Sequence, residues 1–237
     1  MRRFALGFLG LVLLLPPTPG HAQVTVGQRI LERRTVMLTI TGSSGSAGCL
    51  GLRFHREDFP PNVDLVLTAA HCLTDMEGTP SVTVTTLTRQ TGRSVGGLFW
   101  LDLDLAFLLV MPRLGPLDPI RNAVTQPPID SPVLAMVRGG SGAPAVASTR
   151  VLEQDGHLIY LGMPGAPGSS GGGVVDPSGA LVGMISSGTP VVRGQATTPF
   201  VQAVGAAAIL SLLDQERERL AARAREVSRS TPPPASP

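Results

Sequence analysis

Short apolar segments follow one another from Gln23 to about Val110. They are rich in β-branched and apolar residues, and clusters of Gly, Pro, Asn and Asp separate them. Residues 81–88, SVTVTTLT, alternate apolar and hydroxyl side chains, which is the pattern of a strand with one buried face. The segments predicted as strands are residues 36–40, 48–54, 63–70, 81–87 and 105–110.

A second series of strand-like segments follows a proline-rich connector. Residues 111–132 contain six prolines and no clear period, which favours a linker between two halves of the chain. The second series comprises residues 133–137, 145–152, 157–162, 172–176, 180–185 and 199–204. Two successive series of strands without helices between them predict an all-β protein with two similar halves.

The pattern changes to helical spacing near Gly205. The segment that follows consists of strong helix formers, with apolar residues at Ile209, Leu212, Leu213 and Leu220 and mixed charges elsewhere. We expect one amphipathic helix here, and a disordered tail in the proline-rich residues at the end of the chain.

The first 22 residues have the layout of a secretory signal peptide. Arg2 and Arg3 precede a short apolar run, prolines end that run, and small residues suited to cleavage follow. A membrane anchor is the alternative, but the run of about a dozen residues falls short of the ~20 needed to span a bilayer. We therefore expect a mature chain that starts at Gln23, is secreted or periplasmic, and keeps no membrane span.

Composition and charge narrow the function classes. The chain has 237 residues, of which 43% are hydrophobic and 15% charged, so it can bury a sizeable core. It contains no lysine, which excludes a Walker A phosphate loop. The net charge of +2 comes from Arg2 and Arg3, since without them 17 arginines (19 − 2) balance 17 acids. A neutral mature chain does not indicate nucleic-acid binding.

Three residues could together hydrolyse an acyl bond. His71 lies in LTAAHCL, Asp104 directly precedes a buried strand, and Ser170 lies in GSSGGG. Each alone is more often structural: a satisfied histidine, a turn aspartate, a serine in a linker. Together they are the nucleophile, base and orienting carboxylate that serine catalysis requires.

The order of these residues along the chain decides between two kinds of serine hydrolase. Ser170 also fits the G-x-S-x-G pattern of α/β-hydrolases, in which the acid and the histidine follow the serine. Here every histidine precedes it: His21, His55, His71 and His157. The order His, Asp, Ser is the chymotrypsin order.

The chain resembles the trypsin/chymotrypsin-like serine proteases, particularly their bacterial members, in four segments. They are residues 48–54 (GCLGLRF), 66–73 (VLTAAHCL), 104–110 (DLAFLLV) and 168–186 (GSSGGGVVDPSGALVGMIS). The resemblance covers about residues 48–185. It implies two antiparallel six-stranded β-barrels of the chymotrypsin type with a C-terminal α-helix. The expected domains are the signal peptide at residues 1–22, an N-terminal barrel at 23–115, a C-terminal barrel at 116–203, and a helix with its tail at 204–237.

By this resemblance, His71 is the general base, Asp104 orients it, and Ser170 is the nucleophile. Asp102, two residues before Asp104, is the competing candidate on an extended segment. The backbone N–H groups of Gly168 and Ser170 match the oxyanion hole.

The resemblance also implies a disulfide between Cys49 and Cys72, beside the histidine. Ser169 stands where animal enzymes have the aspartate that pairs with a newly cut N-terminus, so we expect no activation of that kind.

The resemblance implies a substrate pocket formed by Pro164, Gly165, Ser186, Ser187 and Gly188. No acid lies near Pro164 in that loop, so we expect a small or apolar residue before the scissile bond rather than arginine or lysine.

The overall expectation is an exported, monomeric serine endopeptidase acting on protein or peptide substrates through an acyl-enzyme, without cofactor or metal. The alternative is a catalytically silent binding protein that keeps the protease fold.

Overall fold

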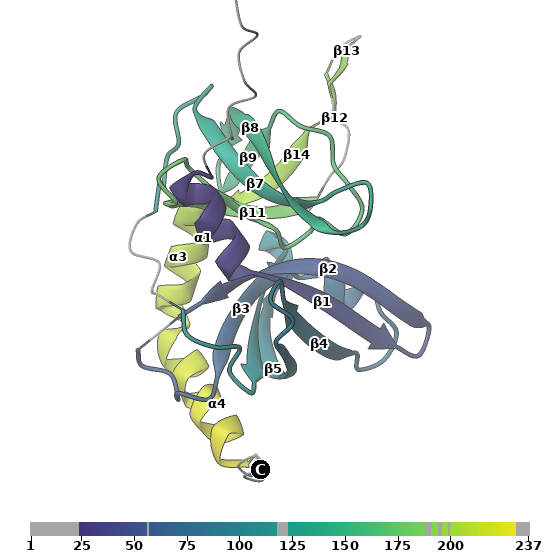
Figure 1. Cartoon of the computed structure of the whole chain (residues 1–237), viewed down its shortest axis with the longest axis vertical. Coiled ribbons are helices and arrows are strands. Elements are labelled where there is room, and N and C mark those ends of the chain that lie inside the picture. Colours follow the sequence, from purple (N-terminus) through teal and green to yellow (C-terminus); the bar gives the residue numbers. More distant parts are fainter. Residues whose placement is uncertain are drawn as a thin grey trace, which may run out of the picture.

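The chain folds into two β-barrels, one above the other in Figure 1. This computed structural model describes residues 24–55, 57–117, 123–187, 191–193, 196–198 and 200–230. The predicted signal peptide and the predicted disordered tail therefore lie outside the described residues.

The first barrel closes in the order β1-β2-β3-β6-β5-β4. Every residue of β3 and β6 is buried, and all of them are apolar except Asp64 and Thr68 of β3. Phe107 is the largest fully buried side chain of the core. The six strands are β1 (Thr35–Gly42), β2 (Gly45–Phe54), β3 (Asp64–Ala69), β4 (Ser81–Thr86), β5 (Thr91–Trp100) and β6 (Leu105–Met111).

The second barrel closes in the order β10-β11-β14-β9-β8-β7, and all its pairings are antiparallel. Two closed six-stranded barrels confirm the expected fold class. The six strands are β7 (Pro132–Arg138), β8 (Pro144–Asp155), β9 (Leu158–Leu161), β10 (Gly173–Val175), β11 (Leu181–Ser187) and β14 (Val201–Gly205). A separate ribbon of β12 (Val191–Arg193) and β13 (Ala196–Thr198) projects away from this barrel (Figure 1).

Helix α1 (Val26–Arg34) corrects the expectation of strands from Gln23 onward. Thr25 caps it, since its hydroxyl accepts a hydrogen bond from the Gln28 N–H at 3.1 Å. Leu31 is fully buried among residues of both barrels, and the Gly27 N–H donates to the carbonyl of Pro177 at 3.1 Å. The first helix is therefore packed at the junction of the barrels.

The C-terminal segment forms two consecutive helices instead of the single helix expected, α3 (Ala206–Gln215) and α4 (Arg217–Ser230). Helix α3 contacts β11 and β14, and α4 then runs along the first barrel to β5 (Figure 1). Their buried apolar residues join the core of the first barrel. No helix among the described residues is both long enough and apolar enough to cross a membrane.

Candidate active site

The pairing of β3 with β6 brings His71 close to Asp104. Ala69 lies opposite Leu105 in this antiparallel pair. His71 begins the short helix α2 (His71–Thr74) just after β3, and Asp104 ends the 3₁₀ turn η1 (Leu101–Leu103) just before β6. Asp104 has a left-handed backbone with φ of 51°, which aspartate tolerates better than most residues. The fold of one barrel thus assembles the imidazole and its carboxylate.

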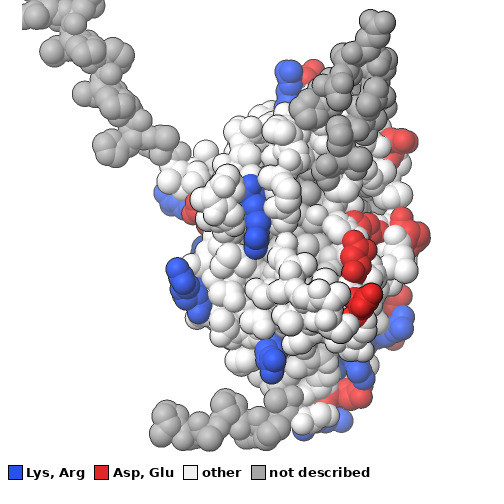
Figure 2. Space-filling view, turned by 90° about the vertical axis from the view of Figure 1, so that its right-hand side faces the viewer, with Lys and Arg blue, Asp and Glu red and all other residues white. Residues whose placement is uncertain are grey.

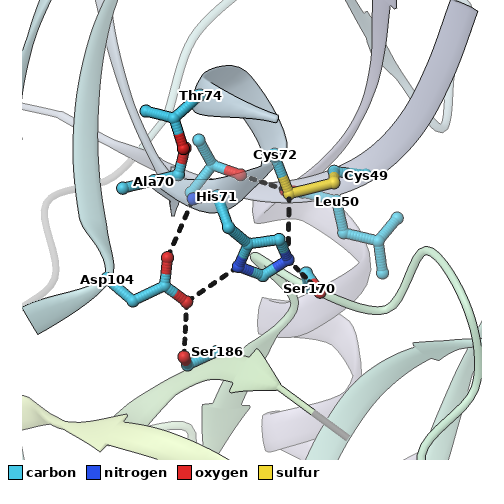
Figure 3. Close-up of a disulfide and its surroundings, with 10 residues drawn as sticks. Cys49, Leu50, Ala70, His71, Cys72, Thr74, Asp104, Ser170 and Ser186 are labelled. Atoms are coloured by element: carbon cyan, nitrogen blue, oxygen red, sulfur yellow. Dashed lines mark hydrogen bonds and ion pairs between the residues drawn. A yellow bond between two sulfur atoms is a disulfide. The ribbon is translucent and has the colours of Figure 1, made fainter. Parts of the chain in front are cut away.

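Asp104 receives hydrogen bonds from two residues. Its Oδ2 lies 2.9 Å from Nδ1 of His71, and its Oδ1 accepts the His71 backbone N–H at 2.9 Å. The hydroxyl of Ser186, at the end of β11, also donates to Oδ2. These contacts fix the carboxylate against one edge of the imidazole (Figure 3).

Asp102 lies apart from this network. It belongs to the 3₁₀ turn rather than to an extended segment, so it does not share a side of the chain with Asp104 as expected. Its side chain is exposed, and it forms no hydrogen bond or ion pair with another described residue. The geometry favours Asp104 over its competitor.

The contacts between His71 and Asp104 shift both pKa values in the direction that keeps the pair charged. The hydrogen bond that His71 donates to Asp104 raises the pKa of His71 above its ordinary value, although burial lowers it. Burial raises the pKa of Asp104, but the hydrogen bonds from His71 and Ser186 outweigh it, and the net pKa is lowered. Asp104 is therefore an anion that can stabilise a protonated His71.

Ser170 reaches the other edge of the same imidazole from the second barrel. Its Oγ lies 3.1 Å from Nε2 of His71 (Figure 3). The carbonyl of Ser170 accepts the Leu50 N–H of β2 at 2.8 Å, which attaches the serine loop to the first barrel. The three residues His71, Asp104 and Ser170 thus form one continuous hydrogen-bonded array across the two barrels.

The loop before Ser170 is a type II turn. The Ser169 N–H donates to the carbonyl of Ala166 at 3.1 Å, Pro167 is the second residue, and Gly168 is the third with φ of 80°. The amides of Gly168 and Ser170 donate to no other atom of the described residues. Two neighbouring N–H groups are therefore available to a ligand oxygen beside the serine hydroxyl.

The glycine after Ser170 lets the loop approach β2. Gly171 has φ of 86°, and a Cβ on it would lie 1.9 Å from the carbonyl oxygen of Leu50. The Gly171 amide donates to the carbonyl of Ile185 at 2.7 Å, so, unlike the amides of Gly168 and Ser170, it is already paired.

A disulfide joins Cys49 of β2 to Cys72 of α2, with an S–S distance of 2.03 Å. The sulfur of Cys72 lies 3.9 Å from Nε2 of His71. The bridge therefore ties the helix that begins with His71 to the strand that holds the Ser170 loop (Figure 3).

The model of the trypsin-like peptidase domain family matches residues 55–184, more than half of the chain. The chain belongs to this family. No curated protein sequence matches it significantly.

Solved structures similar to this trypsin-like peptidase share its fold at low identity. The HtrA-type protease AlgW with tripeptide has a TM-score of 0.64 and 14% identity, over 82% of this chain and 63% of that one. The Rv3671c protease from M. tuberculosis, active form, has a TM-score of 0.63 and 17% identity, over 89% of this chain and 93% of that one. The serine endoprotease from Yersinia pestis has a TM-score of 0.63 and 18% identity, over 80% of this chain and 65% of that one. This chain spans less than two thirds of the first and the third.

The residues expected to line the substrate pocket differ from one another in exposure and in their contacts. Pro164 and Gly165 are exposed on the loop before the type II turn. Ser186 is buried and directs its hydroxyl to Asp104, a contact that no motif indicates because it depends on how the two barrels pack. Ser187 is half-buried, and Gly188 lies outside the described residues.

Charged residues are unevenly distributed on the face shown in Figure 2. On the face in Figure 2 the arginines of the described residues are separated by uncharged surface, and acidic groups lie mostly towards one side. Within the described ranges, no three His, Cys, Asp or Glu side chains form a group that could hold a metal ion.

Proposed function

We propose that the protein is an exported serine endopeptidase that hydrolyses peptide bonds through Ser170, His71 and Asp104. The observation that carries this proposal is the pair of contacts on one imidazole, 2.9 Å from Nδ1 to Asp104 and 3.1 Å from Nε2 to Ser170. These are the distances at which a base can take a proton from a hydroxyl and be oriented by a carboxylate. Membership of the trypsin-like peptidase family supports it.

The acylation step follows from these contacts. Ser170 Oγ attacks the scissile carbonyl carbon, and Nε2 of His71 takes the hydroxyl proton. Asp104 stabilises the resulting imidazolium, since its pKa is lowered and it remains an anion. As the C–N bond breaks, Nε2 gives the same proton to the leaving amine, and Ser170 is left as an ester of the substrate acid.

The amides of Gly168 and Ser170 would hold the oxyanion that forms in each half of the reaction. Both are free of other partners in the described residues, and the type II turn fixes the Gly168 peptide. In deacylation, a water molecule takes the place of the amine and attacks the ester carbon while Nε2 of His71 takes its proton. Nε2 then returns this proton to Ser170 Oγ as the ester C–O bond breaks, which releases the acid and restores the serine.

Export is the second part of the proposal and rests on the sequence of residues 1–22. The Cys49–Cys72 disulfide agrees with an oxidising compartment. Expression of the full chain in a bacterial host, followed by intact mass of the protein outside the cytoplasm, tests it. A mass that starts at Gln23 is expected, and a full-length mass there contradicts cleavage.

Ser170→Ala tests the proposed catalysis. We expect the variant to lose activity on casein by about 10³-fold or more in kcat, because the members of a triad act as a unit. Ser81→Ala is the matched control and should keep full activity, because Ser81 is an exposed serine of β4, far from Ser170 in the sequence. If purified Ser170→Ala digests casein as fast as the wild type, the assignment is wrong.

A covalent probe separates the enzyme from a silent protein of the same fold. An organophosphonate should label the wild type at Ser170 with one equivalent, and the label should be absent from the Ser170→Ala variant. A folded wild type that takes up no label would favour the catalytically silent binding protein.

A further inference from the structure

Arg138 lies beside the glycine of the type II turn. It is the last residue of β7, and its side chain crosses the faces of Gly168 and Gly48. A Cβ on Gly168 would lie 2.8 Å from Cδ of Arg138, and a Cβ on Gly48 would lie 2.9 Å from one of its terminal nitrogens. The guanidinium therefore occupies the space that side chains at both positions would otherwise fill.

The backbone of Arg138 is firmly held, while its charge is unpaired. Its N–H donates to Oγ of the buried Ser169 at 2.9 Å, which links β7 to the residue before the nucleophile. The side chain makes no ion pair or hydrogen bond with any described residue, and its buried Nε has no acceptor. The adjoining loop, residues 139–143, is GGSGA and offers no carboxylate. A half-buried guanidinium without an anion is unfavourable and is stabilised by any carboxylate that docks there.

The contacts of His71 indicate which side of the scissile bond Arg138 faces. Nε2 must deliver its proton to the leaving amine, and the Cys72 sulfur lies 3.9 Å from this atom. Cys72 is bonded to Cys49, which adjoins Gly48, the residue that the guanidinium covers. Ser186 and Asp104 lie at the opposite edge of the imidazole. Through Gly48 and the disulfide, the guanidinium is connected to the Nε2 edge of the imidazole, and we infer that it faces the leaving group.

We propose that Arg138 is a specificity-determining residue that selects substrates with an acidic side chain, Asp or Glu, in the first two positions after the scissile bond. The inference rests on the proposed function and adds a substrate class to it. A guanidinium binds a carboxylate through two parallel N–H···O hydrogen bonds, and a neutral amide of the same shape cannot reproduce the charge.

Matched peptides test the proposal. Internally quenched peptides that differ only in Glu or Gln at the first or the second position after the bond would be compared by kcat/KM. We expect the wild type to prefer Glu by about tenfold at one of these positions, as for a charge-assisted hydrogen bond. Arg138→Gln should bring the Glu/Gln ratio to about one, and Arg138→Glu should invert it. Arg150→Gln, an exposed arginine of β8 in the same barrel, should keep the wild-type ratio.

The ratio is taken within one enzyme preparation, so partial unfolding of a variant does not change it. The role of Arg138 is overturned if the Glu/Gln ratio of the wild type is near one, or if the preference for Glu survives in Arg138→Gln. In either case, cleavage of the peptides still supports the proposed function. A wild type that cleaves no peptide and takes up no organophosphonate overturns both.

Discussion

Each half of the His71 imidazole has its own partner, and the two partners come from different barrels. Asp104 holds Nδ1 from the first barrel, and Ser170 approaches Nε2 from the second. Ser186 adds a donor to the carboxylate that no motif predicts. In the proposed mechanism, the charged Asp104 stabilises the proton that His71 takes from Ser170.

The pH dependence of kcat/KM should reflect the raised pKa of His71. The imidazole must be neutral to accept a proton, so activity should rise with pH with a midpoint above ~6.5, the ordinary pKa of histidine. Asp104→Asn removes the hydrogen bond that raises this pKa. The midpoint should then fall, and kcat should drop on the order of 10⁴-fold.

Asp102→Asn is the matched control, because Asp102 is exposed and only two residues away. We expect its pH profile and kcat to equal those of the wild type. An Asp102→Asn enzyme as impaired as Asp104→Asn would reverse the choice between the two acids.

Gly168→Ala should lower kcat more than it changes KM. Its φ of 80° is strained for alanine, and the added Cβ would lie 2.8 Å from Cδ of Arg138. We expect the turn to rotate its amide away, with a loss of about 10²–10³-fold in kcat, as for the removal of one oxyanion donor. Gly140→Ala is the control, since a Cβ there meets no atom within 4 Å. Equal kinetics for the two variants would contradict a role of the Gly168 amide.

The residues of the candidate site could be named from the sequence, whereas their supporting contacts could not. His71, Asp104 and Ser170 lie in short motifs that carry chemistry. Ser186 and Arg138 depend on how β11 and β7 pack against the first barrel, and no local pattern encodes that packing. The sequence also does not reveal that the glycines near Ser170 have different roles: Gly168 provides the positive φ of the type II turn, and Gly171 allows close approach to β2.

At the scale of elements, segments with a regular apolar pattern were predictable, whereas β5 and α1 were not. Strands β3 and β6 were predictable because they are apolar apart from Asp64 and Thr68, and every residue in them is buried. Strand β5 was missed because its glycines break the pattern, although Gly97 is needed where a Cβ would lie 2.7 Å from the Phe107 carbonyl oxygen. Helix α1 is polar, and its capping signal, Thr25 followed by Gln28, was the one local indication of a helix.

Helix α4 should stabilise the first barrel through its buried face. Leu220 is fully buried in the core cluster of that barrel. Leu220→Ala should lower the free energy of unfolding by about 2–5 kcal/mol, measured by urea denaturation. Arg225→Ala, exposed on the same helix, should change it by less than about 0.5 kcal/mol. A negligible loss in Leu220→Ala would mean that α4 docks too loosely to support the barrel.

At the scale of the whole molecule, each terminal helix crosses to the barrel built from the other end of the chain. Helix α1 precedes the first barrel but contacts β7 and β10 of the second, and α4 follows the second barrel but packs on β5 of the first. Leu31 lies in one buried cluster with Leu50 of the first barrel and Val175 of the second. These contacts join the two barrels that carry His71 and Ser170.

The two barrels should consequently unfold as one cooperative unit. Trp100 is the only tryptophan of the chain and belongs to the first barrel, so its fluorescence reports that barrel alone. Far-UV circular dichroism reports the strands of both barrels. Because the core cluster of the first barrel includes Leu181, Met184 and Val204 of the second, we expect the two signals to give the same urea midpoint. Leu31→Ala should lower both midpoints together. Two separated transitions would show that the two barrels unfold independently.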